Sequence, residues 1–249
     1  MNHVNLSSLA RGYDYRPMSD AARRRAQEAV VERTQPIRVA LDIGGGRGSH
    51  AAVWADANVF AIVLDPSTAM LAHVPEAVHR VCGTAQAIPF AAATVDLVYF
   101  HLSIHYGNWR LSLDEACRVM ARRGQGLIYT LGERHHRQSF LNHWFPSVGR
   151  VDAGRFPNPA DIVSHLGRLG CDVEFSEIDE IVRTTPARFR CSVRAGYVST
   201  LQFVSNDELE QGLAAFDREY VEGDSVEYVL ALDRIAWSAP DTMSGSVGS

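Results

Sequence analysis

The stretch VALDIGGGRGSHAA, residues 39–52, decides the fold of this 249-residue chain. An apolar run passes through Asp42, four glycines follow between positions 44 and 48, and a helix-compatible segment begins at Ser49. Glycines in such a turn let backbone amides approach a ligand that a Cβ would block, and a helix N-terminus favours anionic groups. The stretch therefore predicts a buried strand, a ligand-binding turn and a helix.

The spacing of these glycines disfavours a dinucleotide site. A dinucleotide fingerprint has glycines at relative positions one, three and six. Counted from Gly44, the sixth position is Ser49, and the last glycine of the turn comes one residue early, at Gly48. The spacing therefore argues against a nicotinamide-dependent oxidoreductase.

Composition and charge indicate an ordinary globular protein. Hydrophobic residues make up 46% of the chain and charged residues 21%, which allows a sizeable core. The formal net charge is −5, so no overall positive field attracts a phosphate backbone. We therefore expect no nucleic-acid partner.

The cysteines and the apolar segments bear on the cellular compartment. The four cysteines are widely spaced, with no Cys-x-x-Cys pair, which argues against a zinc site or a disulfide scaffold and suits a reducing compartment. No stretch approaches the roughly 20 apolar residues of a membrane span, and no signal-peptide pattern is present. We expect a cytoplasmic protein with no membrane partner; its oligomeric state is left open.

Strands and helices alternate along the chain, which is typical of a parallel sheet covered by helices. Ser19 or Asp20 is expected to cap the first long helix, and a capping box from Ser112 to Glu115 to open another. Strands are expected at residues 37–43, 59–64, 79–82, 95–100, 126–131, 171–178 and 225–237. The pattern predicts an α/β fold: a Rossmann-like, doubly wound, mostly parallel sheet of seven strands, with a helical insertion between the sixth and seventh strands that serves as a cap.

Four further segments follow the glycine turn in order: VLDPSTAML (63–71), CGTAQAIPF (82–90), TVDLV (94–98) and EACRVM (115–120) before Gly124. Together with the Asp-x-Gly-x-Gly-x-Gly spacing that starts at Asp42, they resemble the motifs of the class I S-adenosylmethionine (SAM) methyltransferases. YDYRP (13–17) resembles the leader of their type 11, small-molecule branch. The resemblance implies an enzyme that uses SAM, releases S-adenosylhomocysteine (SAH) and methylates a small-molecule acceptor.

The resemblance also implies one methyltransferase domain over residues 1–240. Its expected parts are an N-terminal lid (1–35), a SAM-binding core (36–132), substrate-cap elements (133–160 and 184–223) and a last strand (225–237). Residues 241–249, rich in Ser and Gly, are expected to form a disordered tail.

The implied cofactor-binding residues surround the glycine turn. They are Asp42, Gly44, Gly46, Gly48, Asp65, Pro66, Thr84, Ala85, Gln86 and Phe100, with Tyr13 and Arg16 closing over the cofactor. Asp65 ends the second strand, where a carboxylate can accept both ribose hydroxyls. Thr84 stands where the family has an acid against the adenine, so its hydroxyl would accept a hydrogen bond without charge assistance. For Tyr13 and Arg16 the alternative is a surface turn that leads into a helix.

The segment FHLSIHY (100–106), just beyond the fourth strand, is the candidate catalytic segment. His101 and His105 would share a face if the segment were helical, and an imidazole has a pKa suited to deprotonating an acceptor. The alternative is that a histidine holds the loop by bonding a backbone carbonyl. No carboxylate accompanies this pair at ligand spacing, and His135 and His136 adjoin arginines, so we expect no metal.

The insertion supplies the candidate acceptor residues Arg190, Arg194 and Tyr197, and Trp144 follows the fifth strand. Their helical spacing places the first three on one face, suited to a planar or carboxylated small molecule. The alternative is that the aromatic residues belong to the core and the arginines are solvated.

These observations predict SAM-dependent methyl transfer to oxygen, nitrogen or an activated carbon of a small molecule. One alternative is a SAM-binding regulatory or sensor protein without catalysis, to which Thr84 points. The other is a nucleic-acid methyltransferase, which lacks support because the Asn/Asp-Pro-Pro-Tyr/Phe element and a Pro-Cys pair are both absent.

Overall fold

The computed structural model describes residues 4–12, 14, 18–31 and 36–239. Tyr13, Arg16 and the tail at 241–249 lie outside these residues, so the predictions made for them stay predictions.

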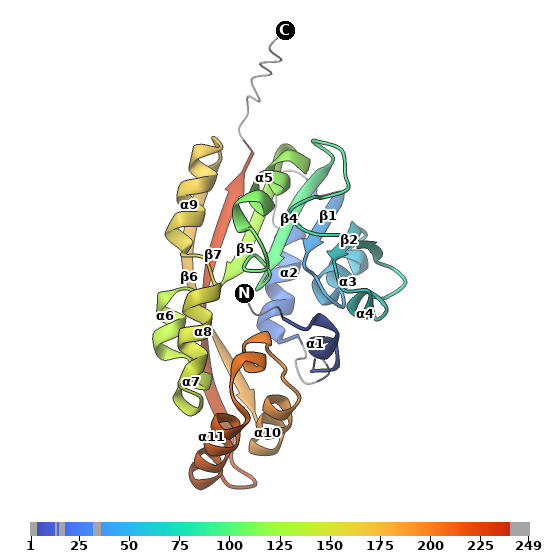
Figure 1. The fold of residues 1–249 in the computed structure, drawn as a ribbon. Helices are drawn as coiled ribbons and strands as arrows, with labels where there is room; N and C mark the ends of the chain where they lie inside the picture. The colour runs from blue at the N-terminus through green and yellow to red at the C-terminus, as the bar shows by residue number, and fades with distance from the viewer. Residues whose placement is uncertain (1–3, 13, 15–17, 32–35, 240–249) are drawn as a thin grey trace.

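A seven-stranded sheet forms the centre of the molecule, in the order β3-β2-β1-β4-β5-β7-β6 (Figure 1). The strands are β1 (Val39–Ile43), β2 (Phe60–Asp65), β3 (His79–Cys82), β4 (Val95–His101), β5 (Met120–Thr130), β6 (Asp172–Thr184) and β7 (Val226–Ser238). Strands β1 to β5 pair in parallel, and β7 runs antiparallel to both β5 and β6. The predicted mostly parallel, doubly wound sheet is confirmed.

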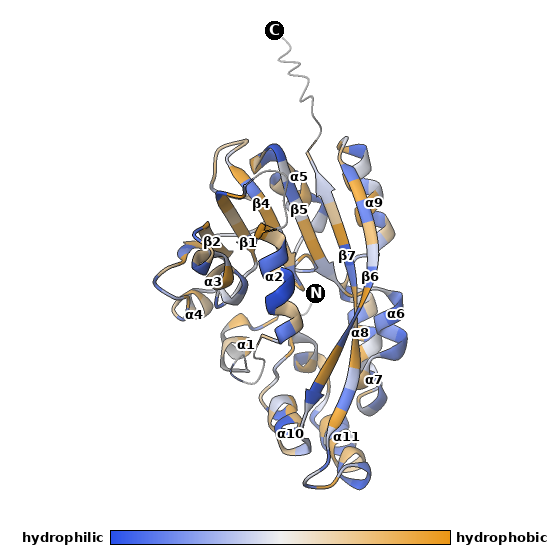
Figure 2. Ribbon diagram, turned by 180° about the vertical axis from the view of Figure 1, so that it is seen from behind, coloured by the Kyte–Doolittle hydropathy of each residue, from blue (hydrophilic) through white to orange (hydrophobic). Residues whose placement is uncertain are grey.

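Helices cover both faces of this sheet, with α5 and α9 on one face and α2 and α3 on the other (Figures 1 and 2). The helices are α1 (Leu6–Gly12), α2 (Asp20–Val31), α3 (Ser49–Asp56), α4 (Thr68–Leu71), α5 (Trp109–Val119), α6 (Glu133–Gln138), α7 (Phe140–Trp144), α8 (Ser147–Arg155), α9 (Pro159–Arg168), α10 (Pro186–Arg194), the 3-10 helix η2 (Ser199–Phe203) and α11 (Asn206–Glu219). The outward side of α2 is hydrophilic in Figure 2, as expected of a helix with one buried side.

Alternation along β4 shows why two layers of core form. Leu97 and Tyr99 pack with α2 and α3, whereas Val98 and Phe100 pack with α5 and α9. Successive side chains of a strand point to opposite faces, so a continuously apolar strand must be covered on both sides.

Side-chain caps set the helix starts. Ser19 accepts the N–H of Ala22 at 3.0 Å, as expected for α2. The expected start at Ser112 is wrong, because α5 begins at Trp109 and the Asn108 side chain accepts two backbone N–H groups. Ser112 lies inside the helix and donates to the Asn108 carbonyl at 3.1 Å.

Three helices, α10, η2 and α11, fill the connection between β6 and β7, as predicted; they are called the cap helices below. They pack with α7 around a separate apolar cluster that includes Phe189, Leu213 and Phe216. In Figure 1 they lie at the lower end of the molecule, with α1 between α4 and α10. None of the helices described is long and apolar enough to cross a membrane.

Candidate active site

A cavity of about 820 Å³ opens at the carboxyl ends of β1, β2 and β4 and continues to β6, β7 and the cap helices. Ligands of open α/β sheets bind at this edge of the sheet, where the strand order reverses. Here the order reverses between β1 and β4, at the glycine turn.

The glycine turn adopts backbone conformations that side chains disfavour. Gly44 and Gly46 have φ of 69° and 57°. A Cβ on Gly44 would also lie 2.6 Å from the Cβ of Ser103, so the turn can pack this closely only with glycine. Gly48 has φ of 75° but packs against Val63 instead of lining the cavity.

Asp65, at the end of β2, is held by two backbone amides. Its Oδ2 accepts the N–H of Gly46 at 3.0 Å, and its Oδ1 accepts the N–H of Ser67 at 2.8 Å. Burial raises the pKa of Asp65, and the two N–H groups partly offset this effect. A carboxylate has about four acceptor positions, so two remain for hydroxyl groups of a ligand.

Asp42 is a buried carboxylate at the same edge, 1% exposed. Neither of its oxygens has a hydrogen-bond partner among the described residues, and the nearest basic group is the Nδ1 of His50, 3.9 Å away. Burial, together with the charge of Asp65, raises the pKa of Asp42 to about 8. A carboxylate in this position suits a positively charged ligand group.

The loop after β3 brings Thr84, Ala85 and Gln86 to the cavity, opposite Pro66. The Nε2 of Gln86 donates to the Tyr106 carbonyl and to Ser112 Oγ, at 3.0 and 2.9 Å. The amide hydrogens of Gln86 therefore hold the loop at Tyr106 and helix α5 at Ser112, which leaves its carbonyl oxygen for a ligand.

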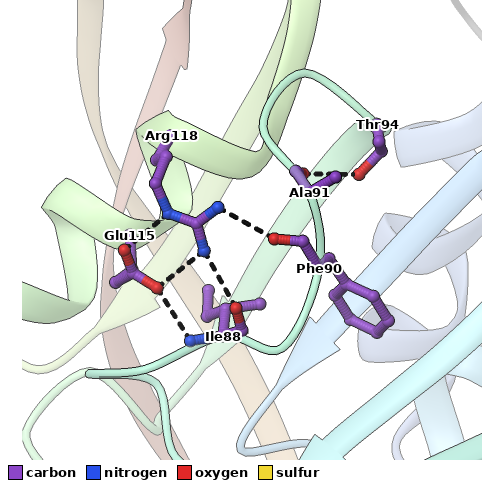
Figure 3. A network of polar contacts seen from close by, with 6 residues as sticks. All are labelled: Ile88, Phe90, Ala91, Thr94, Glu115 and Arg118. Atoms are coloured by element: carbon purple, nitrogen blue, oxygen red, sulfur yellow. Dashed lines mark hydrogen bonds and ion pairs between the residues drawn. The ribbon is translucent and has the colours of Figure 1, made fainter.

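An ion pair on α5 holds the same loop (Figure 3). Arg118 donates to the carbonyls of Phe90 and Ile88 at 2.8 and 2.9 Å and pairs with Glu115. Glu115 in turn accepts the N–H of Ile88 at 2.8 Å, and hydrogen bonding to Arg118 lowers the pKa of Glu115. The segment at 115–120 thus supports the segment at 82–90.

His101 and His105 both line the cavity, although the segment between them is a loop and not a helix. Leu102, with φ of 53°, turns the chain directly after β4. The ring of His101 lies 4.4 Å from that of His50, and the ring of His105 lies 3.9 Å from that of Phe156, measured between centroids.

Besides Gly48, four of the sequence-predicted residues lie away from the cavity. Phe100 is fully buried in the core on the α5 side, and Trp144 packs edge-on against Phe216, 5.3 Å between centroids. Arg190 pairs with Asp217 and Glu222, and Arg194 lies near Glu210. These two arginines turn outward because Phe189 and Val193 occupy the inner side of α10. Tyr197 does line the cavity.

Sequence reasoning missed several residues that line the cavity. They are His50, Phe140, Phe156, Glu180, Arg188 and Tyr228. Only His50 carried a local signal, since it lies in the first turn of the helix after the glycines. Within the described part of the chain, no group of three His, Cys, Asp or Glu residues is arranged to hold a metal ion.

Comparison with known proteins agrees with this geometry. Residues 41–128 match the family model described as a methyltransferase domain. The malonyl-[acyl-carrier protein] O-methyltransferase of Herminiimonas arsenicoxydans is 32% identical over 145 residues, 54% of this chain and 53% of the relative. The enzyme of the same name from Enterobacter lignolyticus is 31% identical over 154 residues, 59% of this chain and 60% of the relative. The matches thus span little more than half the length of these relatives.

Solved structures share the fold. A putative methyltransferase from an antibiotic biosynthesis pathway of Anabaena variabilis superposes with a TM-score of 0.71 at 21% identity, covering 91% of this chain and 98% of that one. The YcgJ protein of Bacillus subtilis gives 0.62 at 16% identity, covering 88% and 97%. The solved structures that share this fold include one named as a SAM-dependent methyltransferase, from Thermotoga maritima. Residues 41–128 therefore resemble a methyltransferase domain of the type 11 branch, and the chain has the fold of the class I SAM-dependent methyltransferases.

Proposed function

We propose that this protein transfers a methyl group from SAM to a small-molecule acceptor. The observation that carries the proposal is one continuous cavity, which runs from the glycine turn and Asp65 to the aromatic residues under the cap helices. One end suits a nucleoside with a charged amino acid, and the other end offers a separate space for an acceptor. When bound, SAM supplies a methyl group already activated by its positive sulfur.

The residues at the cofactor end fit SAM. Asp65 keeps two acceptor positions for the ribose hydroxyls after bonding Gly46 and Ser67. Asp42 offers unbonded oxygens to the ammonium group of the methionine part. Gly44, Gly45 and Gly46 all line the cavity, and without a Cβ their backbone can approach a ligand closely.

The acceptor would be aligned beside His101 and His105. Methyl transfer requires an in-line approach and exclusion of water more than it requires acid–base groups. If the acceptor atom is protonated at working pH, His101 or His105 accepts its proton. Both side chains line the cavity, on the loop that follows β4.

The names of the relatives suggest a second candidate acceptor, a malonyl group carried by acyl carrier protein. Its methylated atom would be a carboxylate oxygen, which is ionised at neutral pH and needs no base. This candidate and a neutral small molecule therefore differ in their need for His101 and His105. We also infer that the reaction takes place in the cytoplasm, because the widely spaced thiols suit a reducing compartment.

The test is to titrate SAM, SAH and NAD into the protein by calorimetry and then to assay transfer of labelled methyl groups. The acceptor panel contains phenols, amines, carboxylic acids and malonyl-acyl carrier protein. SAM and SAH binding without NAD binding, followed by label transfer, supports the proposal. Binding of SAM with no transfer to any member of a broad panel favours the sensor alternative.

A further inference from the structure

The charges along the cavity are unevenly distributed. Its cofactor end carries the carboxylates of Asp42 and Asp65. Its far end, between β6 and α10, carries the exposed guanidinium of Arg188. Among the residues that the structure describes, no carboxylate lies within ion-pair distance of Arg188.

Other charged groups that line the cavity have partners of their own: Asp152 accepts a hydrogen bond from Thr200 and lies near Arg155. Arg25 pairs with Glu180 at 2.6 Å, and Arg183 pairs with Glu227 at 2.7 Å. His135 is buried, and the pKa of its imidazole is lowered to about 4 by burial and by His136, so it is neutral near pH 7. Within the described part of the chain, Arg188 is thus a charge without an ion-pair partner that this part of the cavity offers to a ligand.

Local structure places Arg188 at the cavity. Thr185 caps α10 by accepting the N–H of Arg188 at 3.3 Å, and Pro186 begins the helix. Arg188 therefore lies in the first turn, next to cavity residues Thr184 and Thr185, whereas Arg190 points to acidic residues outside the cavity.

Three aromatic residues line the same cavity as Arg188. Phe140 and Tyr228 stack with ring centroids 4.6 Å apart and an interplanar angle of 3°, and Phe189 meets Phe140 edge-on at 5.4 Å. All three line the cavity. Aromatic walls of this kind favour flat, apolar molecules.

We propose that Arg188 determines acceptor specificity and that the acceptor is a flat, apolar molecule with an anionic group. This inference rests on the proposed function, because it assigns the far end of the cavity to the acceptor. The anionic group would be held by the guanidinium of Arg188, the flat body by Phe140 and Tyr228, and the cationic donor by the acidic end.

Two fluorescent probes separate the charge from the apolar body. Anilinonaphthalene sulfonate has an aromatic body with an anionic group, and N-phenylnaphthylamine has a similar body without charge. Arg188→Gln should weaken binding of the sulfonate by about three- to tenfold, given a charged hydrogen bond at a partly solvated position. Binding of the uncharged probe should change less than twofold. Arg188→Lys should recover much of the loss.

Arg190→Gln is the matched control on the same helix and should leave both probes unaffected. The inference is overturned if Arg188→Gln leaves the affinity for the sulfonate unchanged or lowers the affinity for both probes equally. It is also overturned if Arg190→Gln lowers the affinity for the sulfonate as much as Arg188→Gln does. It is also overturned if SAH displaces the sulfonate competitively. SAH titration of the wild-type protein tests the proposed function separately, since Arg188→Gln should bind SAH like the wild type.

Discussion

The N–H of Gly46 donates to the carboxylate of Asp65 at 3.0 Å, so the acid at the end of β2 directly braces the glycine turn after β1. Gly46 and Asp65 lie close together because β1 and β2 pair in parallel and end at the same edge of the sheet. Asp65 thus holds the turn, and under the proposed function it also receives the ribose.

Asp65→Ala should therefore weaken SAH binding by about 1.5–3 kcal/mol, the range for losing hydrogen bonds to a charged group. Calorimetric titration measures the change. Asp56→Ala, an exposed acid at the end of α3, is the control and should bind SAH normally. Unchanged affinity in Asp65→Ala would show that the ribose lies elsewhere.

Binding of SAH should depend on pH through Asp42. The pKa of this carboxyl is raised to about 8 in the ligand-free protein, so Asp42 is largely protonated at neutral pH. An ammonium group beside it favours the ionised form, and binding then releases a proton. Affinity should therefore rise as the pH increases from about 6 to about 8. Calorimetric titrations in buffers of different ionisation enthalpy measure the number of protons released on binding. Asp42→Asn should bind SAH more weakly, and its affinity should not rise over this pH interval.

The stability of the ligand-free protein should change with pH in the opposite direction. The pKa of Asp42 is about 8 when folded, against an ordinary value of 3.8. Between these two pKa values the folded state therefore holds a proton that the unfolded state has released. The stability that this proton contributes falls as the pH increases from about 4 and is lost once the pH passes about 8. The melting temperature of the wild type should fall more than that of Asp42→Asn over this interval. Parallel curves for the two proteins would contradict the assignment of this titration to Asp42.

Variants at His101 and His105 show whether the protein supplies a base. If it does, His101→Ala or His105→Ala should lower turnover by about 10²–10⁴-fold while SAH affinity changes less than twofold. His73→Ala, in an exposed turn, should leave both unchanged. Turnover that survives both active-site variants would point to an acceptor already ionised, such as a carboxylate.

The sequence predicted those features that depend on local chemistry. Buried strands are continuously apolar, and the turn at Gly44 to Gly48 needs φ values that glycine supplies. A short stretch of sequence therefore predicts both the strand and the turn. The start of α5 was misplaced because Asn108 and Ser112 are both good caps four residues apart, and only tertiary structure selects between them.

The proposed acceptor end of the cavity was less predictable, because which side chains reach it depends on how the helix is rotated about its axis. Arg188, Arg190 and Arg194 all lie on α10, and packing of Phe189 against Phe216 decides which of them reaches the cavity. Likewise, nothing local to His50 indicates that its ring will lie against His101, which is distant in sequence and joins it only through the sheet.

Arg47, within the glycine turn, connects the cofactor end to the N-terminal helix. It donates to the Ala10 carbonyl at 2.7 Å and pairs with Asp14. Helix α1 in turn contributes Leu6 and Leu9 to the cavity wall. At the other end of α1, Asn5 exchanges two hydrogen bonds with Gln202 of η2, at 2.8 and 3.1 Å. Removing the contacts of Arg47 should therefore release the C-terminal end of α1, while the hydrogen bonds between Asn5 and Gln202 still hold its N-terminal end.

Arg47→Met keeps an apolar stem but removes both contacts, and should raise the dissociation rate of SAH by about two- to tenfold, as expected for hydrogen bonds that are partly exposed. Hydrogen exchange should accelerate in the amides of residues 4–12 and stay unchanged in β4. Arg24→Met, on the exposed side of α2, is the control. If Arg47→Met speeds exchange in α1 without changing SAH dissociation, α1 does not retain the cofactor; if neither changes, Arg47 does not hold α1 in place.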